Sequence, residues 1–304
     1  MTSARNVTFF LDDGLRESAE AGEHNFIGKV VSVLRSAGFE VAFRPNSQAA
    51  RLSSALRPGY AMLHMDQPTH ARALTMRRVY HYPFWQIETT TERWDWHVAK
   101  ADFDPASIDP QEAQRFHGFW RRRLFPDAPP ASREGFVYVP LQGRLTECRS
   151  FQTASPVQMV EAVLQNDPDR LVIATFHPGE SYSDKERQAI YSLAERHPRL
   201  SVKTGSMDRL LPGCDYVVTQ NSSAAFNGIL FEKPFILFGK SDFHHIAANV
   251  SALGVPEAFR TVMGMAPDNA VYLWWFWQQM SINAGREGAE DKIAAALARG
   301  GWPI

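Results

Sequence analysis

The second half of the chain alternates short apolar runs with amphipathic segments, and this pattern restricts the possible fold more than any other feature. Five runs are predicted to be strands, at residues 136–141, 171–175, 200–203, 216–219 and 234–238. Their apolar residues are continuous rather than alternating, which is typical of strands buried on both faces of a parallel sheet. Predicted helices lie between them, as the crossover connections of such a sheet require. We therefore predict a doubly wound α/β domain in this half.

The first half opens with a similar unit. Residues 7–11 and 39–43 are predicted strands, with a helix over 25–37 between them and Gly38 at the expected helix stop. This β-α-β order again indicates a parallel sheet. A chain of 304 residues is longer than one core usually serves, so we expect two domains.

A proline-rich segment indicates where the boundary between the two predicted domains lies. Residues 125–134 include Pro126, Pro129 and Pro130, a composition that suits an interdomain linker. We therefore predict a Rossmann-like N-terminal domain at 1–130 and a Rossmann-like C-terminal domain at 131–270. The last segment, 271–304, is predicted to be helical and to pack back across the domains.

Composition excludes several classes of protein. The formal net charge is −1, so no global basic field favours nucleic acid as a partner. The two cysteines, Cys148 and Cys214, lack metal-ligand spacing, and their number excludes a disulfide framework. The polar segment 1–6 does not resemble a signal peptide, and no apolar run approaches the roughly 20 residues that cross a bilayer. We expect a cytoplasmic protein. Basic clusters at 77–78 and 121–123 are typical of solvated surface, and contact with an anionic acceptor glycan or with the inner membrane face is the alternative.

Polar side chains follow three of the predicted strands in the second half. Ligands of open parallel sheets bind beyond the carboxyl ends of the strands, so these side chains are expected to converge on one crevice. The candidates for substrate binding in this crevice are Gln142, His177, Pro178, Gln220, Asn221, Ser222 and Ser223.

Two of these clusters have a specific chemistry. Asn221, Ser222 and Ser223 precede a predicted helix at 224–231, where unpaired backbone N–H groups and the helix dipole attract a phosphate. Capping of that helix by a serine is the alternative interpretation. Pro178 restricts His177 to an extended backbone, and that histidine could donate to phosphate or transfer a proton. A histidine that only completes a turn is the alternative.

Two acidic sites stand out in the first half. Asp12 and Asp13 follow the first predicted strand, and Glu88 closes the sequence Gln86-Ile87-Glu88. Group transfer to a hydroxyl requires a carboxylate that takes the proton or acts as a nucleophile, and either site could supply it. Asp12 and Asp13 could instead cap the next element, and Glu88 could be a surface charge.

The sequence at 211–239, with Gln-Asn-Ser-Ser at its centre, resembles the nucleotide-sugar domain of GT-B glycosyltransferases. It is most similar to bacterial capsule polysaccharide biosynthesis proteins, which include the Kdo transferases. Residues 139–142 are similar to the strand that opens their C-terminal domain. His177-Pro178 resembles their HP motif, Ser222-Ser223 their Ser/Thr pair, and Gln86-Ile87-Glu88 the QxE motif of the Kdo transferases.

This resemblance implies a GT-B-like fold, with two Rossmann-like domains whose parallel sheets face across a cleft. It also implies a metal-independent glycosyltransferase that needs no cofactor. The donor would be a CMP-activated sugar, Kdo or a related acidic sugar, and the acceptor a surface or capsular polysaccharide. His177, Ser222 and Ser223 would hold the donor phosphate. Glu88 would be the catalytic carboxylate, ranked above Asp13, whose Asp-Asp-Gly context resembles a motif of bacterial sialyltransferases.

The sequence departs from the family at Asn227-Gly228, where relatives usually carry a Glu-Ala-like pair. That glutamate commonly binds the donor ribose in GT-B enzymes. Alternatives therefore stay open at this point: a UDP-sugar-dependent GT-B enzyme, a sugar epimerase, or a non-catalytic partner that binds glycan or nucleotide in a polysaccharide assembly complex.

Overall fold

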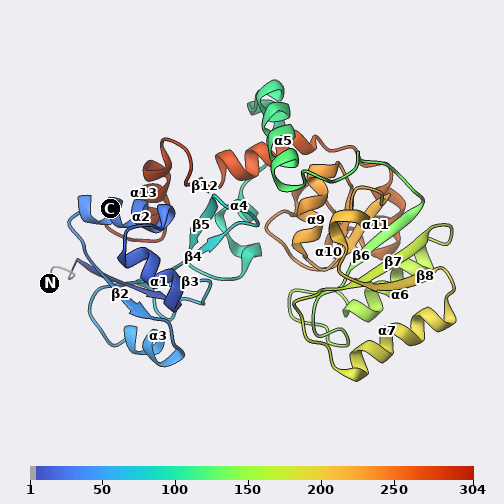
Figure 1. Ribbon diagram of the computed structural model, residues 1–304, viewed down its shortest axis with the longest axis horizontal. Coiled ribbons are helices and arrows are strands. Elements are labelled where there is room, and N and C mark those ends of the chain that lie inside the picture. The colour runs from blue at the N-terminus through green and yellow to red at the C-terminus, as the bar shows by residue number, and fades with distance from the viewer. Residues whose placement is uncertain (1–4) are drawn as a thin grey trace. The chain divides into compact units, whose positions relative to one another are not determined.

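The computed structural model describes residues 5–304 (Figure 1). Residues 1–4, part of the segment in which no signal peptide is predicted, lie outside this range. The chain forms two compact units. Unit 1 comprises Met1–Ala101 and Phe276–Ile304, and unit 2 comprises Asp102–Trp275.

Unit 1 is built on a six-stranded sheet in the order β12-β5-β4-β3-β1-β2. Strands β1 to β4 pair in parallel, β5 runs antiparallel to β4, and β12 antiparallel to β5. The reversal at β5 carries its last residue, Glu88, back to the level of Thr75, midway along β4. The strands are β1 Asn6–Leu11, β2 Glu40–Pro45, β3 Tyr60–His64, β4 Ala73–Arg78, β5 Phe84–Glu88 and β12 Ile282–Asn283.

Two helices from opposite ends of the sequence share the core of unit 1. Apolar residues of α2 recur at Phe26, Val30 and Leu34, a helical spacing that buries one stripe against the sheet. The ring of Phe26 stacks on Trp85 of β5 with centroids 4.5 Å apart. Helix α13 packs against α2 in the same core. The helices of this unit are α1 Asp13–Glu20, α2 Asn25–Ser36, α3 Gln48–Ser54, α4 His97–Lys100 and α13 Ala289–Arg299.

Unit 2 contains a fully parallel sheet in the order β11-β10-β9-β6-β7-β8. The first strand of the unit, β6, lies between β7 and β9, so the winding direction reverses there, as in the Rossmann order. The predicted doubly wound domain is therefore confirmed. Its strands are β6 Phe136–Pro140, β7 Leu171–Phe176, β8 Leu200–Thr204, β9 Tyr216–Thr219, β10 Phe235–Leu237 and β11 Ala248–Asn249.

Capping residues mark the N-termini of two helices in unit 2. Capping boxes at Ser155 with Gln158, and at Ser183 with Glu186, satisfy the free N–H groups of α6 and α7. The helix predicted at 224–231 is α9 followed by a 3₁₀ turn, η3 Ile229–Phe231. The helices are α5 Pro110–Leu124, α6 Pro156–Asn166, α7 Asp184–Arg196, α8 Met207–Leu210, α9 Ser223–Gly228, α10 Val250–Leu253, α11 Val255–Val262 and α12 Asn269–Trp274.

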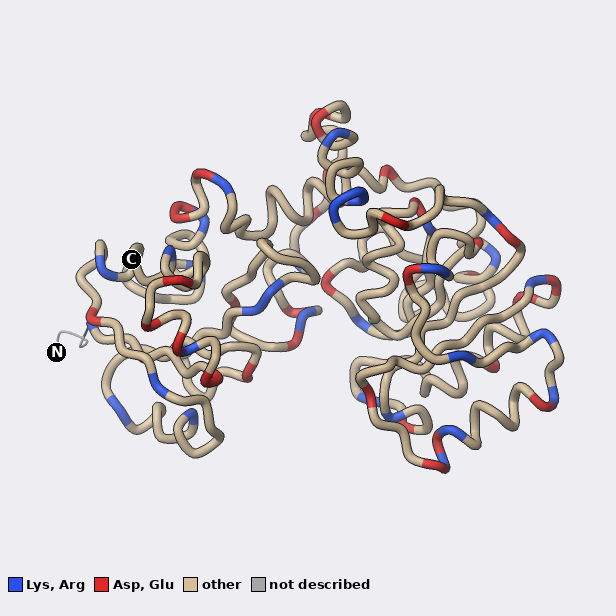
Figure 2. The backbone as a smooth tube through the Cα atoms, viewed as in Figure 1, with Lys and Arg blue, Asp and Glu red and all other residues tan. Residues whose placement is uncertain are grey.

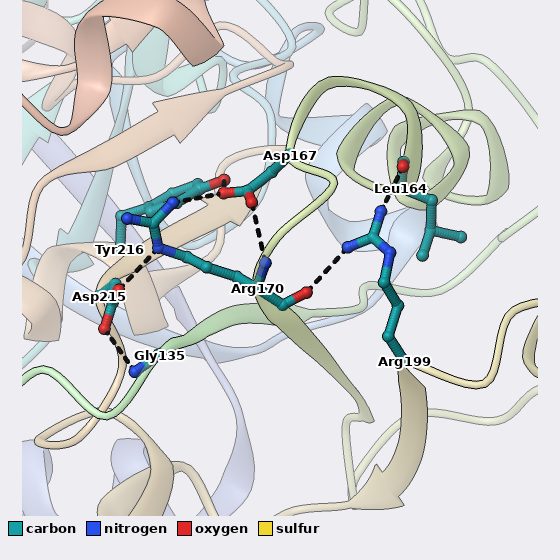
Figure 3. Close-up of polar contacts among 7 residues, drawn as sticks. All are labelled: Gly135, Leu164, Asp167, Arg170, Arg199, Asp215 and Tyr216. Atoms are coloured by element: carbon teal, nitrogen blue, oxygen red, sulfur yellow. Dashed lines mark hydrogen bonds and ion pairs between the residues drawn. The ribbon is translucent and has the colours of Figure 1, made fainter.

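A polar network ties the starts of β6, β7 and β9 together (Figure 3). The Arg170 guanidinium pairs with Asp215 at 2.6 Å and with Asp167 at 3.0 Å. Tyr216 donates its hydroxyl proton to Asp167, and the N–H of Gly135 donates to Asp215. This network occupies the amino edge of the sheet and leaves the carboxyl edge to the candidate site.

The division between the units differs from the boundary predicted near residue 130. Helix α5 belongs to unit 2, because it packs against α12 and η3, and His117 contacts the carbonyl of Ile229 at 3.0 Å. The prolines after α5 lie in an irregular segment of unit 2, whose residues Ser132 and Glu134 donate to the carbonyls of Pro212 and Gly213. The segment 271–304 begins in α12 of unit 2 and ends with α13 in unit 1.

Candidate functional site

A cavity of about 400 Å³ opens at the carboxyl edge of the unit 2 sheet. It is formed where β6, β7, β8 and β9 end, on both sides of the reversal in strand order. Such a reversal is where doubly wound sheets bind ligands. The polar residues that line it are Tyr138, Thr175, His177, Ser206, Asp208, Ser222, Ser223 and Asn227.

His177 follows β7 and lines this cavity together with Pro178. Its Nδ1 accepts a hydrogen bond from the N–H of Gly179 at 3.1 Å, and its own N–H donates to the Tyr182 hydroxyl at 2.9 Å. A neutral imidazole that accepts at Nδ1 carries its proton on Nε2. The turn thus fixes the ring and leaves Nε2–H as a donor, so the turn interpretation and the ligand interpretation are compatible.

Ser222 and Ser223 lie on another wall of the cavity, at the start of α9. The Ser222 oxygen accepts from the N–H of Ala224 at 3.2 Å, so this serine does cap the helix. A capping hydroxyl still has its own proton to donate. The structure therefore brings His177, Pro178, Ser222 and Ser223 together at one cavity.

The other predicted side chains of the crevice have internal partners instead. Gln142 and Asn221 exchange two hydrogen bonds, of 3.2 and 3.1 Å, and Asn221 also donates to the Lys240 carbonyl. Gln220 donates to the carbonyl of Ala154. None of Gln142, Gln220 and Asn221 lines the cavity. These amides hold the loop after β9 in place and so position Ser222 and Ser223.

Sequence reasoning missed one wall and the floor of the cavity. Tyr138 and Thr175 form the floor, joined by a hydroxyl–hydroxyl hydrogen bond of 3.1 Å, and burial raises the pKa of Tyr138 to about 12. The wall comes from the loop after β8, where Ser206 adopts a left-handed backbone with φ of 65°. Asn227, noted only as a departure from the family, also lines the cavity and donates to the Met207 sulfur at 3.6 Å. The strand end at 200–204 was the signal that could have located this loop.

Glu88 lies in a second cavity, of about 180 Å³, within unit 1. Glu88 is only 7% exposed. The same cavity is also lined by Asp95, His97, Lys100 and Arg299. Burial raises the pKa of Glu88 to about 7, against the opposing effects of the His97 N–H and the charges of Arg299 and Lys100. A carboxyl group with this pKa can both take and give a proton near neutral pH.

Gln86, the first residue of the QxE sequence, points elsewhere. Its side-chain amide is buried and donates to the carbonyl of Met280 at 2.8 Å. Gln86 thus fastens β5 to the segment that precedes β12. It does not line the cavity that holds Glu88.

Asp13 and Glu88 are not brought together. Asp13 begins α1, is exposed, and pairs with Arg16 at 3.4 Å. In the sheet register, Glu88 aligns with Phe10 through Thr75 and Leu63. Three strand spacings therefore separate Glu88 from β1, a distance of about 14 Å.

Among residues 5–304, no group of three or more histidine, cysteine, aspartate or glutamate side chains is arranged to hold a metal ion. In the same range, no helix has both the length and the apolar character needed to cross a membrane.

Part of the chain is similar to a known protein family. Residues 147–278 match the sequence model of the capsule polysaccharide biosynthesis proteins. The resemblance predicted from the sequence is thereby confirmed, and the matched segment contains His177, Pro178, Ser222 and Ser223. No curated protein sequence shows a significant match.

The overall fold is similar to that of the beta Kdo 2,7 transferase of KpsC from Thermosulfurimonas dismutans. The TM-score is 0.55 at 13% identity, with 96% of this chain and 98% of that chain covered. A UDP-GlcNAc 2-epimerase from Neisseria meningitidis aligns at 12% identity over 97% and 99% of the two chains, with a TM-score of 0.39. The first similarity and the two sheets described above establish a GT-B-like fold of two Rossmann-like units, as predicted.

The matched segment covers unit 2 from the loop after β6 onward and continues to residue 278. The family match therefore includes the cavity walls formed by β7, β8 and β9. Glu88 and Asp13 lie outside it, so their roles depend on the geometry of unit 1.

Proposed function

We propose that this chain is a glycosyltransferase that takes a CMP-activated sugar into the cavity of unit 2. In this proposal it transfers Kdo, or a related acidic sugar, to a growing surface or capsular polysaccharide. The observation that carries the proposal is the convergence of His177, Ser222 and Ser223 on one cavity at the reversal of a doubly wound sheet. The family of the matched segment and the Kdo transferase named above support the choice of sugar and acceptor.

The cavity suits a phosphate that carries a nucleoside on one side. His177 offers Nε2–H, while Ser222 and Ser223 offer hydroxyl protons to the same cavity. Donors of this kind form short, strong hydrogen bonds to an anionic oxygen. A volume of about 400 Å³ lies within the usual range for small-molecule sites. The nucleotide-linked sugar is a substrate here, and neither a cofactor nor a metal ion takes part.

Glu88 is the carboxylate that we assign to catalysis. Its pKa of about 7 suits a group that accepts the proton of an acceptor hydroxyl. Asp13 is the competing candidate. Asp13 does not line the cavity that holds Glu88, and its exposed carboxylate pairs with Arg16, so we rank Glu88 above it.

The two cysteines support a cytoplasmic location. Both are free thiols, Cys148 exposed and Cys214 buried. Free thiols persist in a reducing compartment.

Calorimetric titration of the full chain with CMP and with UDP tests the donor. We expect CMP to bind and the His177→Ala variant to bind it about tenfold more weakly, the loss expected for one hydrogen bond to a charged group. Preference for UDP would refute the CMP assignment. Failure of both nucleotides to bind would refute the assignment of the cavity itself.

A further inference from the structure

Helix α5 has one face packed into unit 2. Phe116, His117 and Trp120 are buried on this face, which contacts α12 and η3. The contact of His117 with the Ile229 carbonyl fixes the rotation of the helix about its axis. The orientation of the opposite face is thereby fixed as well.

The outer face of α5 combines an aromatic ring with arginines. Phe119 is 50% exposed. Arg115 lies four residues before it, and Arg122 and Arg123 lie three and four residues after it, so all four side chains share one face of the helix. Arg122 and Arg115 are exposed, and the Arg123 guanidinium lies 5.8 Å from the ring centroid of Trp120.

The charge on this helix is not balanced. It carries four arginines against one acidic residue, Glu112, whereas the whole chain has a net charge of −1. Within the described range 5–304, no carboxylate forms an ion pair with Arg115, Arg122 or Arg123. Figure 2 marks the resulting basic run at the C-terminal end of α5.

Helix α7 of the same unit provides a contrast. It also presents an exposed aromatic ring, Tyr191, at 43% exposure. Its cations alternate with an equal number of acids: Lys185, Arg187 and Arg196 against Asp184, Glu186 and Glu195. Mixed charges of this kind are typical of a solvated helix face. The outer face of α5 lacks them.

We propose that the outer face of α5, formed by Arg115, Phe119, Arg122 and Arg123, docks on an anionic lipid bilayer. The arginines pair with lipid phosphates, and the ring of Phe119 enters the boundary between headgroups and acyl chains, as in interfacial amphipathic helices. A soluble polyanion would satisfy the guanidinium groups but would leave the ring in water. The exposed ring at the centre of the basic face therefore favours the bilayer.

Sedimentation of the full chain with phospholipid vesicles tests this proposal. We expect binding to vesicles of equal parts phosphatidylcholine and phosphatidylglycerol, and little binding to phosphatidylcholine alone. The double variant Arg115→Gln/Arg122→Gln should bind on the order of 20-fold more weakly, because each basic residue near an anionic surface contributes roughly fivefold. Phe119→Ala should also weaken vesicle binding several-fold, but the salt dependence of vesicle binding should stay unchanged.

Matched variants on α7 are the controls. The double variant Lys185→Gln/Arg196→Gln removes two positive charges, as the α5 double variant does. Tyr191→Ala removes an exposed aromatic ring, as Phe119→Ala does. Both α7 variants should bind vesicles as the parent does. Equal binding of the parent to neutral and anionic vesicles, or no binding, would overturn the proposal. Tight binding to heparin that Phe119→Ala leaves unchanged, without vesicle binding, would assign the face to a soluble polyanion instead. Should the double variant fail to fold, the single variants Arg122→Gln and Phe119→Ala decide by the same comparison.

Discussion

The backbone N–H of His97 donates a hydrogen bond of 3.2 Å to Oε1 of Glu88. This contact joins the last residue of β5 to the first residue of α4, and it points a donor at a carboxyl group that burial separates from water. The hydrogen bond favours the ionised carboxylate, but desolvation favours the neutral acid more strongly and raises the pKa of Glu88 to about 7. Glu88 therefore links the stability of unit 1 to pH.

The sign of that link can be predicted. An acid whose pKa is raised in the folded state favours folding fully below its unfolded pKa of about 4.5, and this contribution disappears as pH rises through about 7. The Glu88→Gln variant lacks this dependence. We expect its unfolding free energy to rise relative to the parent between about pH 5 and pH 8, by at most about 3 kcal/mol.

Urea denaturation of parent and variant at both pH values measures this difference. The exposed residue Glu195 on α7 supplies the matched control, because Glu195→Gln removes one carboxyl group that is not buried. A Glu88→Gln variant whose stability tracks the parent across this range would show that the carboxyl group ionises normally in the folded state.

The same residue is expected to decide activity. Glu88→Gln preserves the shape of the side chain and the hydrogen bond from His97, but it cannot take a proton. If Glu88 is the catalytic carboxylate, sugar transfer should fall by at least about 100-fold while CMP affinity stays at the parent value. Assay of transfer from a CMP-activated sugar, together with calorimetry, separates the two quantities.

Asp13→Asn is the matched variant for this assay. Because Asp13 is exposed and remote from Glu88, its substitution should reduce transfer little. The opposite outcome, an inactive Asp13→Asn and an active Glu88→Gln, would transfer the catalytic role to Asp13.

Much of unit 2 could be predicted from its sequence because its determinants are local. Continuous apolar runs located the strands, and His177 and Ser222 followed directly from the positions of strand ends. The roles of Gln142 and Asn221 could not be found in this way. Their amides bond to each other across 79 residues of sequence, which removes them from the cavity.

The unit boundary and the surroundings of Glu88 depend on the C-terminal segment. Helix α5 joins unit 2 through α12, about 150 positions later in the chain, so local proline content misplaced the boundary. Arg299, on the wall of the Glu88 cavity, is more than 200 positions from Glu88. A local sequence pattern cannot predict contacts between residues that lie so far apart in the sequence.

Arg170 is expected to contribute strongly to the stability of unit 2. It pairs with both Asp167 and Asp215, which are buried (Figure 3). Burial alone would raise the pKa of Asp167, but hydrogen bonds from Tyr216 and Arg170 hold it below the usual value. Arg170→Ala would leave two buried carboxylates without their cation and should reduce the unfolding free energy by about 3 kcal/mol.

Thermal and urea unfolding of Arg170→Ala check this value. Arg196→Ala on α7, which removes an exposed guanidinium, should change stability by less than about 0.5 kcal/mol. Equal effects of the two substitutions would show that the network adds nothing beyond a surface charge.

Two serines that cap helices allow the effect of a cap on stability to be separated from an effect on ligand binding. Ser222 caps α9 at the cavity, and Ser183 caps α7 outside it. Each alanine variant should reduce the unfolding free energy by about 1 kcal/mol, because each removes one side-chain cap. Only Ser222→Ala should weaken CMP binding, by about tenfold, because only that hydroxyl can donate to the phosphate in the cavity. Calorimetry with CMP at a temperature where both variants are fully folded makes the comparison. If the two variants bind CMP equally well, Ser222 is a helix cap alone and the phosphate site lies elsewhere.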